Sequence, residues 1–553
     1  MNSLKQIKKY LANKKYECFL IPKNNEFFNE YINSKEDYLK KISNFTGSLG
    51  FALIFKNRQF LYVDGRYTEQ AKVQCKNFKI KSIFQLKKDL KKINNQKKII
   101  CINPKLFKNI FFKGLEIKYF CFFNNLKKDA QDLKKIIILK NKFSGEETVS
   151  KIQRVNKILK LKKDEVFFLS SVENIAWISN IRSLNKEYTY LLNCHALIKN
   201  SKIYIFINKK INKSISDQII FKKNTDLKVF LKSSKKIIYD ENNISLYNQN
   251  YIKTLKIKLL KIKDPIFDLK SIKNSTEINN LKIAHLFDGI AYVKFLFWLK
   301  NNIRKNLNEI TIQNKLETFK KKNKFYIGPS FETISAVEKN ASIIHYNAKN
   351  FIPKILRKNN MYLLDAGSQY FYGTTDMTRT FSFSKQKYLR KKIYTLILKS
   401  HIAVAQYKIE KNTTGKQIDY IARKNLIKNK LNYNHGTGHG VGYFSNVHES
   451  PPSISQYSLN KFQEHQVLSN EPGFYKKNDF GIRLENLVFI NKTRFFDTLT
   501  LVPFDNSMIL KKMLTKNEKR WINDYHENVF EKLNKFLNKK EKEYLKYLCS
   551  VIN

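Results

Sequence analysis

The stretch MYLLDAGSQYFYGTTDMTRTF, residues 361–381, decides both the fold and the chemistry expected of this chain. An apolar strand ends in Asp365, a glycine-bounded connection follows, and a threonine-rich strand carries Asp376. Residues on facing antiparallel strands have Cβ atoms about 4.5–5.5 Å apart, so the turn brings the two carboxylates together. Two buried carboxylates repel each other unless a cation lies between them. The stretch therefore predicts a divalent metal site, with two turn-capping aspartates as the alternative.

Two further regions supply an imidazole and two more carboxylates. HGTGHGVG (435–442) has four glycines in eight residues, so extended backbone is expected there rather than helix. SNEPGFY (469–475) and GIRLENLV (481–488) each carry a glutamate. On a continuous strand, alternation places Arg483 and Glu485 on one face. Because the run is apolar, a buried ligand with Arg483 as its neighbour is favoured over a surface salt bridge.

The collected candidate ligands are four carboxylates and one imidazole: Asp365, Asp376, His439, Glu471 and Glu485. This set does not match a structural zinc site, which prefers Cys and His in a closed tetrahedron. Hard oxygen ligands in excess fit Mn²⁺-like cations in a dinuclear hydrolytic site.

The pattern of apolar runs predicts an α/β (α+β) protein with several domains. A hairpin over 51–63 and a strand over 99–102 indicate a first α/β domain, and residues 148–260 repeat the pattern, as a duplication would. A long amphipathic helix over 276–298 opens the segment with the motifs. The expected boundaries are 1–143 and 144–263 for two α/β domains, 264–510 for the third, and 511–553 for a helical extension.

Composition excludes some classes of function. The 553 residues include 104 Lys and Arg against 46 Asp and Glu, a net charge of +58. The lysines are scattered without a dense basic arm, which favours a compositional bias over specific nucleic-acid binding. No stretch approaches the ~20 apolar residues that span a bilayer. The start lacks a secretory apolar core, and the six cysteines form no CxxC pair, so a cytoplasmic protein with reduced thiols is expected.

These motifs resemble those of the pita-bread metallopeptidases, and within them the three-domain Xaa-Pro aminopeptidases (aminopeptidase P). The match lies in LLDAGSQY, GTTDMTRT, HGTGHGVG, SNEPGFY and GIRLENLV, in the Asp-x10-Asp and Glu-x13-Glu spacings, and in N-terminal segments such as DGRY (64–67). The resemblance implies two creatinase-type N-terminal domains, a pita-bread catalytic domain and a C-terminal helical extension. It further implies removal of the first residue before a proline, by a hydroxide bridging two divalent metals, Mn²⁺ with Zn²⁺ or Co²⁺ as alternatives.

The resemblance also implies a role for each site residue. Asp365 chelates one metal, Asp376 and Glu485 bridge the two, and His439 and Glu471 complete the other. Glu471 is expected to carry the proton from the nucleophile to the leaving amine. Three histidines are expected to be catalytic by hydrogen bonding the scissile carbonyl and the developing oxyanion. The full set expected to bind substrate is His345, His435, His448, Arg483 and Arg66. The expected partners are peptides with a penultimate proline and a second copy of the chain, with no specific nucleic acid and no membrane.

Two alternatives stay open at this point. Prolidase, which cleaves Xaa-Pro dipeptides, shares the metal site, although the three-domain length and the extension favour the aminopeptidase. A catalytically inactive pita-bread protein that binds RNA or another protein suits the charge, but such relatives lose ligands and all five are present here. One departure from the family pattern is His465-Gln466, where the family usually has Gly-Met, so a different local turn is expected.

Overall fold

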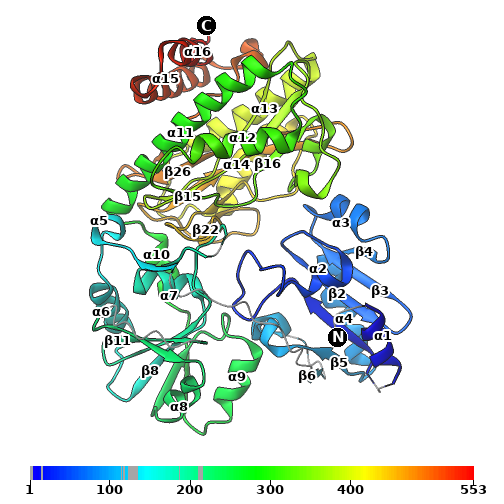
Figure 1. Cartoon of the computed structure of the whole chain (residues 1–553), viewed down its shortest axis with the longest axis vertical. Helices are drawn as coiled ribbons and strands as arrows, with labels where there is room; N and C mark the ends of the chain where they lie inside the picture. Colours follow the sequence, from blue (N-terminus) through cyan, green and yellow to red (C-terminus); the bar gives the residue numbers. More distant parts are fainter. Residues whose placement is uncertain are drawn as a thin grey trace. The chain divides into compact units, whose positions relative to one another are not determined.

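The computed structural model describes residues 4–13, 16–113, 115, 119–121, 135–185, 187–208 and 216–553. The chain forms two compact units (Figure 1). The N-terminal unit contains Met1–Asn141, Glu146–Lys186 and Tyr190–Phe267. The C-terminal unit contains Lys142–Gly145, Glu187–Thr189 and Asp268–Asn553. The units are described separately below.

The N-terminal unit is built on two six-stranded mixed sheets. The first has the order β4-β3-β2-β1-β5-β6, with strands Lys79–Ser82, Gln59–Val63, Gly50–Phe55, Cys18–Pro22, Ile100–Ile102 and Tyr119–Cys121. The second has the order β12-β11-β10-β8-β13-β14, with strands Ile219–Lys223, Lys202–Ile207, His195–Lys199, Glu165–Leu169, Lys236–Tyr239 and Lys258–Lys261. A two-stranded sheet pairs β7 (Ile136–Ile138) with β9 (Ile181–Ser183).

The two six-stranded sheets have the same topology. In each, the first strand is central and pairs antiparallel with the next strand of the sheet, which continues into an antiparallel hairpin. The three remaining neighbours in each sheet pair in parallel. The helices of the two halves are α1 (Leu4–Ala12), α2 (Tyr38–Ser43), α3 (Thr68–Gln74), α4 (Leu86–Asn95), α6 (Thr148–Leu159), α7 (Val172–Ser179), α8 (Asp226–Lys232) and α9 (Leu246–Lys253). This shared strand order is what a duplication produces, as the repeated sequence pattern predicts.

The C-terminal unit combines sheets of short strands with long helices (Figure 1). Its sheets have the orders β15-β18-β19, β16-β17-β20, β22-β21-β23-β26-β27 and β24-β25, in which β15 is Tyr326–Gly328 and β27 is Phe496–Thr498. The strands that bear on the site are β16 (Ile334–Val337), β17 (Met361–Asp365), β18 (Gln369–Tyr370), β19 (Gly373–Thr374), β20 (Thr378–Ser382), β21 (Gly438–Gly440), β22 (Glu449–Ile454), β23 (Val467–Asn470), β24 (Gly473–Lys476), β25 (Phe480–Arg483) and β26 (Asn486–Ile490). The helices are α11 (Ser275–Asn302), α12 (Glu309–Lys320), α13 (Tyr388–Ala405), α14 (Gly415–Lys428), α15 (Lys516–Leu533) and α16 (Lys539–Leu548). Two short helices, α5 (Asn141–Ser144) and α10 (Ile266–Ser271), contain residues of both units.

Helix α11 is longer at both ends than the expected 276–298. Its start is fixed by a capping box, in which the Asn274 side chain accepts from the Glu277 amide and the Glu277 carboxylate accepts from the Asn274 amide. Helices α15 and α16, the C-terminal extension, pack against α11. The main core of the unit joins α13, β25 and α15 through residues such as Tyr394, Ile482 and Ile522.

The decisive stretch forms an antiparallel pair as predicted, but Asp376 lies before strand β20 rather than on it. Asp365 is opposite Thr378 in the pairing of β17 with β20, and the Ala366 amide donates to the Met377 carbonyl at 3.0 Å. The next position in that course places Asp376 beside Gly367. A Cβ on Gly367 would lie 2.1 Å from Ser330 Oγ and 2.2 Å from the Thr375 carbonyl oxygen, so only glycine fits there.

The expected strand through GIRLENLV is broken, which corrects the prediction that one continuous strand carries Arg483 and Glu485. Strand β25 ends at Arg483 and pairs with β24, whereas β26 begins at Asn486 and pairs with β23. In the gap, the Glu485 amide donates to the Thr378 carbonyl at 3.0 Å. The chain therefore changes partner at Glu485, and this change directs the glutamate at Thr378.

His465, at the position where the family pattern has glycine, has a φ of 63°. This value lies in the left-handed region that favours glycine. No described helix is both long and apolar enough to cross a bilayer. Among the described cysteines, Cys18, Cys75, Cys101, Cys194 and Cys549 are free thiols.

Candidate metal centre

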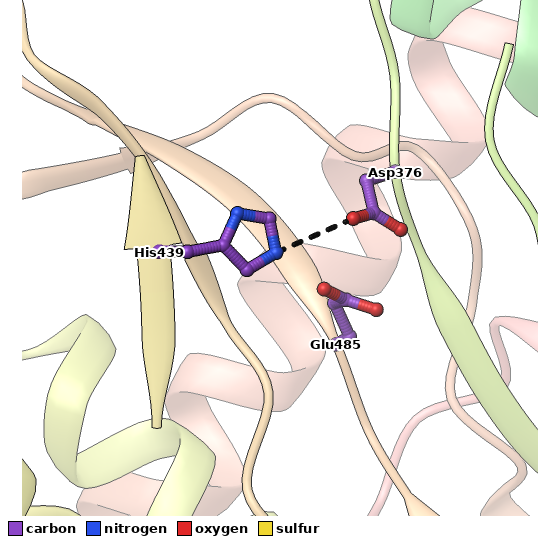
Figure 2. A group of neighbouring side chains, drawn as sticks. All are labelled: Asp376, His439 and Glu485. Atoms are coloured by element: carbon purple, nitrogen blue, oxygen red, sulfur yellow. Dashed lines mark ion pairs between the residues drawn. The ribbon is translucent and has the colours of Figure 1, made fainter. Parts of the chain in front are cut away.

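Three of the predicted ligands meet at the ends of different strands (Figure 2). Asp376 precedes β20, His439 lies on β21, and Glu485 lies in the break between β25 and β26. One ligand atom from each lies within 4.8 Å of the other two. The Nε2 atom of His439 is 3.6 Å from Oδ2 of Asp376.

The tautomer of His439 is set by its own strand. The Nδ1 atom is 2.9 Å from the Gly440 carbonyl oxygen, which only accepts, so Nδ1 carries the proton and donates. In the neutral ring Nε2 is then the nitrogen without a proton, and it faces Asp376 and an oxygen of Glu471, each at 3.6 Å. A lone pair directed at two carboxylates is unfavourable without a cation between them. Histidines that bind metals are held in this way, with the second ring nitrogen donating to a backbone carbonyl.

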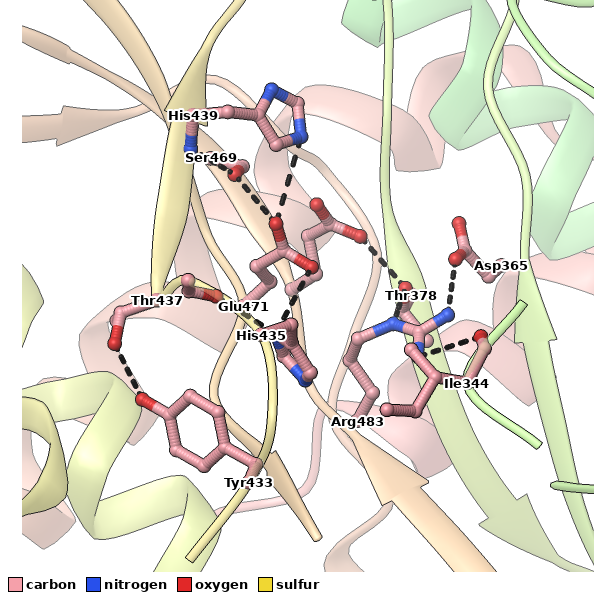
Figure 3. A network of polar contacts seen from close by, with 12 residues as sticks. Ile344, Asp365, Thr378, Tyr433, His435, Thr437, His439, Ser469, Glu471 and Arg483 are labelled. Carbon is pink, nitrogen blue, oxygen red and sulfur yellow. Dashed lines mark hydrogen bonds and ion pairs between the residues drawn. The ribbon is translucent and has the colours of Figure 1, made fainter. Parts of the chain in front are cut away.

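Glu471 joins the same group from the end of β23 (Figure 3). Its amide donates to the Thr437 carbonyl at 2.8 Å, and its Oε1 accepts from Ser469 Oγ at 3.2 Å. Its Oε2 lies 4.0 Å from Nδ1 of His435. Glu471 therefore lies between the ligand histidine and one of the expected substrate histidines.

Asp365 enters the network through Arg483, which corrects the expectation that Arg483 serves Glu485 directly. Arg483 Nη2 is paired with Oδ2 of Asp365, and Nε donates to Thr378 Oγ1 at 3.1 Å (Figure 3). Thr378 Oγ1 donates in turn to Oε2 of Glu485 at 2.7 Å. Arg483 therefore touches Asp365 and reaches Glu485 through one hydroxyl, because the break in the strand turns the two side chains apart.

Burial raises the pKa of several of these carboxyl groups in the protein without a metal. For Asp376 and Glu485, burial is the largest cause, and the charges of neighbouring carboxylates raise their pKa values further. Burial raises the pKa of Glu471 to about 7, against the opposing charges of Arg483 and His448. The group as a whole thus lacks positive charge, although Arg483 lies beside it.

The donors fit a hard divalent cation. Among the described residues, Oδ1 of Asp365 and Oδ1 of Asp376 are buried and have no hydrogen-bond donor. Buried carboxylate oxygens without a donor are costly unless a metal takes the donor's place. A donor set of carboxylate oxygens with a single imidazole is typical of sites for Mn²⁺-like ions. A closed structural zinc site would instead be built from Cys and His.

Two of the expected substrate histidines adjoin the ligands. The rings of His448 and His439 have centroids 4.2 Å apart. His435 donates from Nδ1 to the Gly436 carbonyl at 2.7 Å, so its Nε2 accepts from the Tyr475 hydroxyl at 2.9 Å. His345 follows Ile344, whose carbonyl accepts from Arg483 Nη1 at 3.4 Å. Arg66 lies in the N-terminal unit, where it pairs with Asp64 at 2.6 Å.

The sequence reasoning missed the residues that link these groups. The Tyr475 hydroxyl accepts from Arg483 Nη1 at 2.6 Å and donates to His435, joining two parts of the site. Thr378 connects Arg483 to Glu485, and Ser469 connects the His439 amide to Glu471. Tyr475 and Ser469 flank Glu471 in SNEPGFY, but a hydroxyl carries no spacing signal that separates a linking role from a surface position.

Family models match almost the whole chain. Metallopeptidase family M24 matches residues 279–492, and the C-terminal region of that peptidase family matches 493–552. Two models of the creatinase/prolidase N-terminal domain match residues 4–125 and 127–277. The matched regions together follow the same order as the two N-terminal halves, the site-bearing segment and the helical extension.

Full-length relatives agree with the family models. Xaa-Pro aminopeptidase 1 of Dictyostelium discoideum is 30% identical, over 96% of this chain and 92% of that protein. A probable Xaa-Pro aminopeptidase P of Phaeosphaeria nodorum is 33% identical, over 91% of this chain and 85% of its own length.

Solved structures show the same fold. The X-prolyl aminopeptidase of Caenorhabditis elegans, described as a cytosolic enzyme with a di-nuclear active site, superposes with a TM-score of 0.88 at 24% identity over 99% of both chains. The prolidase of Pyrococcus horikoshii gives a TM-score of 0.52 at 23% identity and covers 65% of this chain.

Proposed function

Because the chain belongs to metallopeptidase family M24 and is matched over its length by Xaa-Pro aminopeptidases, we propose that it removes the first residue of peptides with proline second. The protein is a metal-dependent hydrolase of the Xaa-Pro aminopeptidase type. The observation that carries this function is the position of His439, whose Nε2 faces Asp376 and Glu471 at 3.6 Å within a buried carboxylate group.

The residues that would hold the metals are the five assembled above. We propose two divalent ions, with Asp365 on one, His439 and Glu471 on the other, and Asp376 and Glu485 shared between them. The excess of oxygen ligands favours Mn²⁺. When bound, such ions polarise the scissile carbonyl and lower the pKa of the attacking water.

The side chains of this protein supply the proton transfers and the binding of the oxyanion. Glu471 is placed to take the proton of the attacking water and deliver it to the leaving prolyl nitrogen, because its carboxylate lies between His439 and His435. His345, His435 and His448 hydrogen bond the scissile carbonyl and the developing oxyanion, a role worth about 10²–10³ in rate for a comparable donor. Arg483 fixes Asp365 and the Tyr475 hydroxyl.

Proline at the second position explains the need for a dedicated enzyme. An X-Pro bond is a tertiary amide without an N–H, and the preceding residue is restricted to extended conformations. A site that recognises ordinary peptides through that N–H has no donor to bind here. The free α-amino group of the first residue lies near the carboxylates in this arrangement, which limits cleavage to one residue.

The remaining assignments are part of the same proposal. We place the domain boundaries at 143/144, 263/264 and 510/511, and we assign Arg66 to substrate binding. We also propose a cytoplasmic homodimer, in line with the cytosolic C. elegans enzyme. Prolidase activity is the nearest alternative, and the full-length matches favour the aminopeptidase. RNA binding by an inactive protein is disfavoured because the ligand set is complete.

The test is hydrolysis of Arg-Pro-Pro, with Ala-Pro and Arg-Ala-Pro assayed beside it. The protein is first dialysed against a chelator and then supplied with Mn²⁺ or Zn²⁺. Release of free arginine from Arg-Pro-Pro alone, restored by Mn²⁺, is expected. Cleavage of only Ala-Pro would move the assignment to prolidase, and cleavage of Arg-Ala-Pro at an equal rate would remove the requirement for proline. The Asp376→Asn variant serves as the control that should stay inactive with either metal.

A further inference from the structure

The two aspartate ligands, Asp365 and Asp376, are joined by one hairpin, residues 366–375, which is held from outside by a buried ion pair. We propose that Asp288, with Lys320, is a positioning residue that sets the separation and direction of these two ligands. The inference rests on the ligand assignment in the proposed function. Asp288 lies on α11 and Lys320 ends α12, so neither belongs to the strands that carry the ligands.

Asp288 accepts hydrogen bonds from three side-chain hydroxyls, and all three belong to the hairpin. Oδ1 accepts from Ser368 Oγ at 2.7 Å and from Tyr370 Oη at 2.8 Å. Oδ2 accepts from Thr375 Oγ1. The carboxylate is 7% exposed, and its donors include a residue near each end of the hairpin. One carboxylate therefore fixes the chain just after Asp365 and just before Asp376.

Lys320 holds the same hairpin from a second helix, and Asp288 and Lys320 together form what we call the clamp. Its Nζ lies 3.9 Å from Oδ1 of Asp288 and donates to the Gly367 carbonyl at 3.0 Å. The lysine is 4% exposed. A buried ion pair is weak evidence for stability, because removing two charges from water costs much of what their attraction returns. Because both members of the ion pair also bind the hairpin, we infer that the pair fixes the geometry of the hairpin.

The hairpin itself leaves little freedom once Asp288 is in place. Thr375 Oγ1 accepts from the Ser368 amide at 2.9 Å while it donates to Asp288. The Thr375 amide donates to the Ser368 carbonyl at 2.8 Å, and Ser330 Oγ donates to the Thr375 carbonyl at 2.9 Å. Thr375 immediately precedes Asp376, so these bonds orient the ligand directly. Loss of Asp288 would leave the Thr375 hydroxyl without its acceptor at this point.

The two metal positions depend on the hairpin to different degrees. Under the proposed ligation, the ion on Asp365 takes two of its three protein ligands, Asp365 and Asp376, from the two ends of this hairpin. The other ion shares Asp376, but its remaining three ligands, His439, Glu471 and Glu485, come from elsewhere in the unit. Loosening the hairpin should therefore release the ion on Asp365 first, and the second ion should remain.

The experiment measures metal content and affinity of the full-length protein. Asp288→Asn and Tyr370→Phe are prepared beside Tyr326→Phe as a matched control. Tyr326 is packed against the Tyr370 ring with centroids 5.6 Å apart, but its hydroxyl donates to Glu317 on α12 at 2.6 Å and not to Asp288. Bound Mn²⁺ per chain is counted after desalting, and the affinity is obtained by titrating Mn²⁺ into chelated protein.

For Asp288→Asn, the expected result is retention of one ion and an affinity for the other that falls by about 10–100-fold, the usual effect of removing a partner of a metal ligand. Tyr370→Phe should shift the same affinity in the same direction by a smaller factor, and Tyr326→Phe should bind both ions as the parent does. With Arg-Pro-Pro, kcat should fall while KM stays nearly constant.

Several outcomes would overturn the proposal. Two ions bound by Asp288→Asn with parental affinity would mean that the clamp does not set the ligands. An equal loss of both ions, or an equal effect of Tyr326→Phe, would indicate general destabilisation. If Asp288→Asn does not fold, Tyr370→Phe carries the same test on its own. If the parent binds two ions but leaves Arg-Pro-Pro intact, the proposed function fails while the metal counts still decide the role of Asp288.

Discussion

The two histidines whose rings meet in the site, His439 and His448, face different surroundings. His439 directs its Nε2 at carboxylates 3.6 Å away, whereas His448 occupies an exposed position beside it. Substitution of a residue that holds the metal should therefore differ in its effect from substitution of a residue that binds substrate. The two effects should be distinguishable although the ring centroids are only 4.2 Å apart.

For this reason we expect His448→Ala to lower kcat by about 10²–10³-fold, as loss of an oxyanion donor does. Its metal content should stay at the parental value because no ligand has changed. Asp376→Asn should lose metal and activity together. Metal analysis of both variants by mass spectrometry, with kcat and KM for Arg-Pro-Pro, checks the assignment. A loss of metal from His448→Ala would show that this histidine is a ligand.

The carboxylates of the site should make the stability of the metal-free protein depend on pH. Burial raises the pKa of Glu471 from its ordinary value of 4.5 to about 7, and it also raises the pKa values of Asp376 and Glu485. A carboxyl whose pKa is higher in the folded state binds more protons there than in the unfolded chain. The stabilising contribution is thus complete below about pH 4.5 and is lost as the pH rises through about 7.

The measurement is the urea midpoint of chelated protein between about pH 5 and pH 8. We expect the midpoint to fall with rising pH, because the free energy of unfolding falls by an amount on the order of 3 kcal/mol from Glu471 alone. Glu471→Gln, which has no titrating group at that position, should show a flatter profile. Saturation with Mn²⁺ should reverse the trend, because the ligands must be deprotonated to bind it. A midpoint of the chelated parent that rises over this range would contradict the assignment.

At the scale of elements, the C-terminal helix α15 supports the strands next to the candidate metal ligands through the buried side chain of Arg379. Arg379 on β20 is 2% exposed and donates from Nη1 to the Glu485 carbonyl at 2.6 Å. Its Nη2 donates to the Tyr525 hydroxyl of α15 at 3.0 Å, and that hydroxyl donates to the Val502 carbonyl at 2.6 Å. The extension, to which the sequence assigned no chemistry, is therefore connected to the backbone of the candidate ligand Glu485.

Tyr525→Phe should lower the free energy of unfolding by about 1–3 kcal/mol, because a buried donor of Arg379 and the Val502 carbonyl each lose a partner. Activity should fall modestly, since Glu485 keeps its side chain but loses part of its support. Tyr420→Phe is the control, because Tyr420 is 60% exposed. Urea unfolding followed by tryptophan fluorescence measures both variants. Equal midpoints for the two would show that α15 is not coupled to β20.

The elements that the sequence predicts are those in which local pattern and tertiary structure agree. The hairpin near residues 51–63, the helix near 276–298 and the extended HGTGHGVG segment are all present. The break between Arg483 and Glu485 was not predicted, because alternation describes a strand with one partner and here the chain passes from β24 to β23. For the same reason the pairing of Arg483 with Asp365 is invisible in the sequence.

The candidate ligands could be proposed from the sequence motifs, whereas the groups that orient them could not. Asp365 and Asp376 are close in sequence and flank a glycine-rich turn, which makes their meeting predictable. Asp288 lies 77 residues before Asp365, and it contacts the hairpin only because α11 packs behind it. Side chains recruited across such distances leave no periodic signal, so the candidate site is known from sequence as a list and from structure as a network.

At the scale of the whole molecule, metal removal should lower stability as well as activity. An ion that binds only the folded chain stabilises it by RT ln(1 + [L]/Kd), or about 2.7 kcal/mol at 100 times Kd. We therefore expect chelation to lower the unfolding temperature and Mn²⁺ to restore it. Asp376→Asn should show little response to either treatment. Calorimetry with and without chelator checks this, and an unfolding temperature insensitive to chelation would argue against a metal in the native site.

The net charge of +58 is the other property of the whole molecule, and it should affect association with polyanions far more than catalysis. Exposed lysines such as Lys424 and Lys428 on α14 and Lys539 and Lys540 on α16 are outside the site network. Replacing these four by Gln should weaken retention on a heparin column, because each removes a solvated charge. Hydrolysis of a neutral peptide such as Ala-Pro-Ala should change by less than about 3-fold, since interactions beyond a Debye length of about 10 Å are screened in buffer.

Cleavage is measured for parent and variant at low and high salt. A large loss of kcat/KM in the variant, or strong inhibition of the parent by heparin at high salt, would show that the lysines serve the reaction and not only the solubility of the chain.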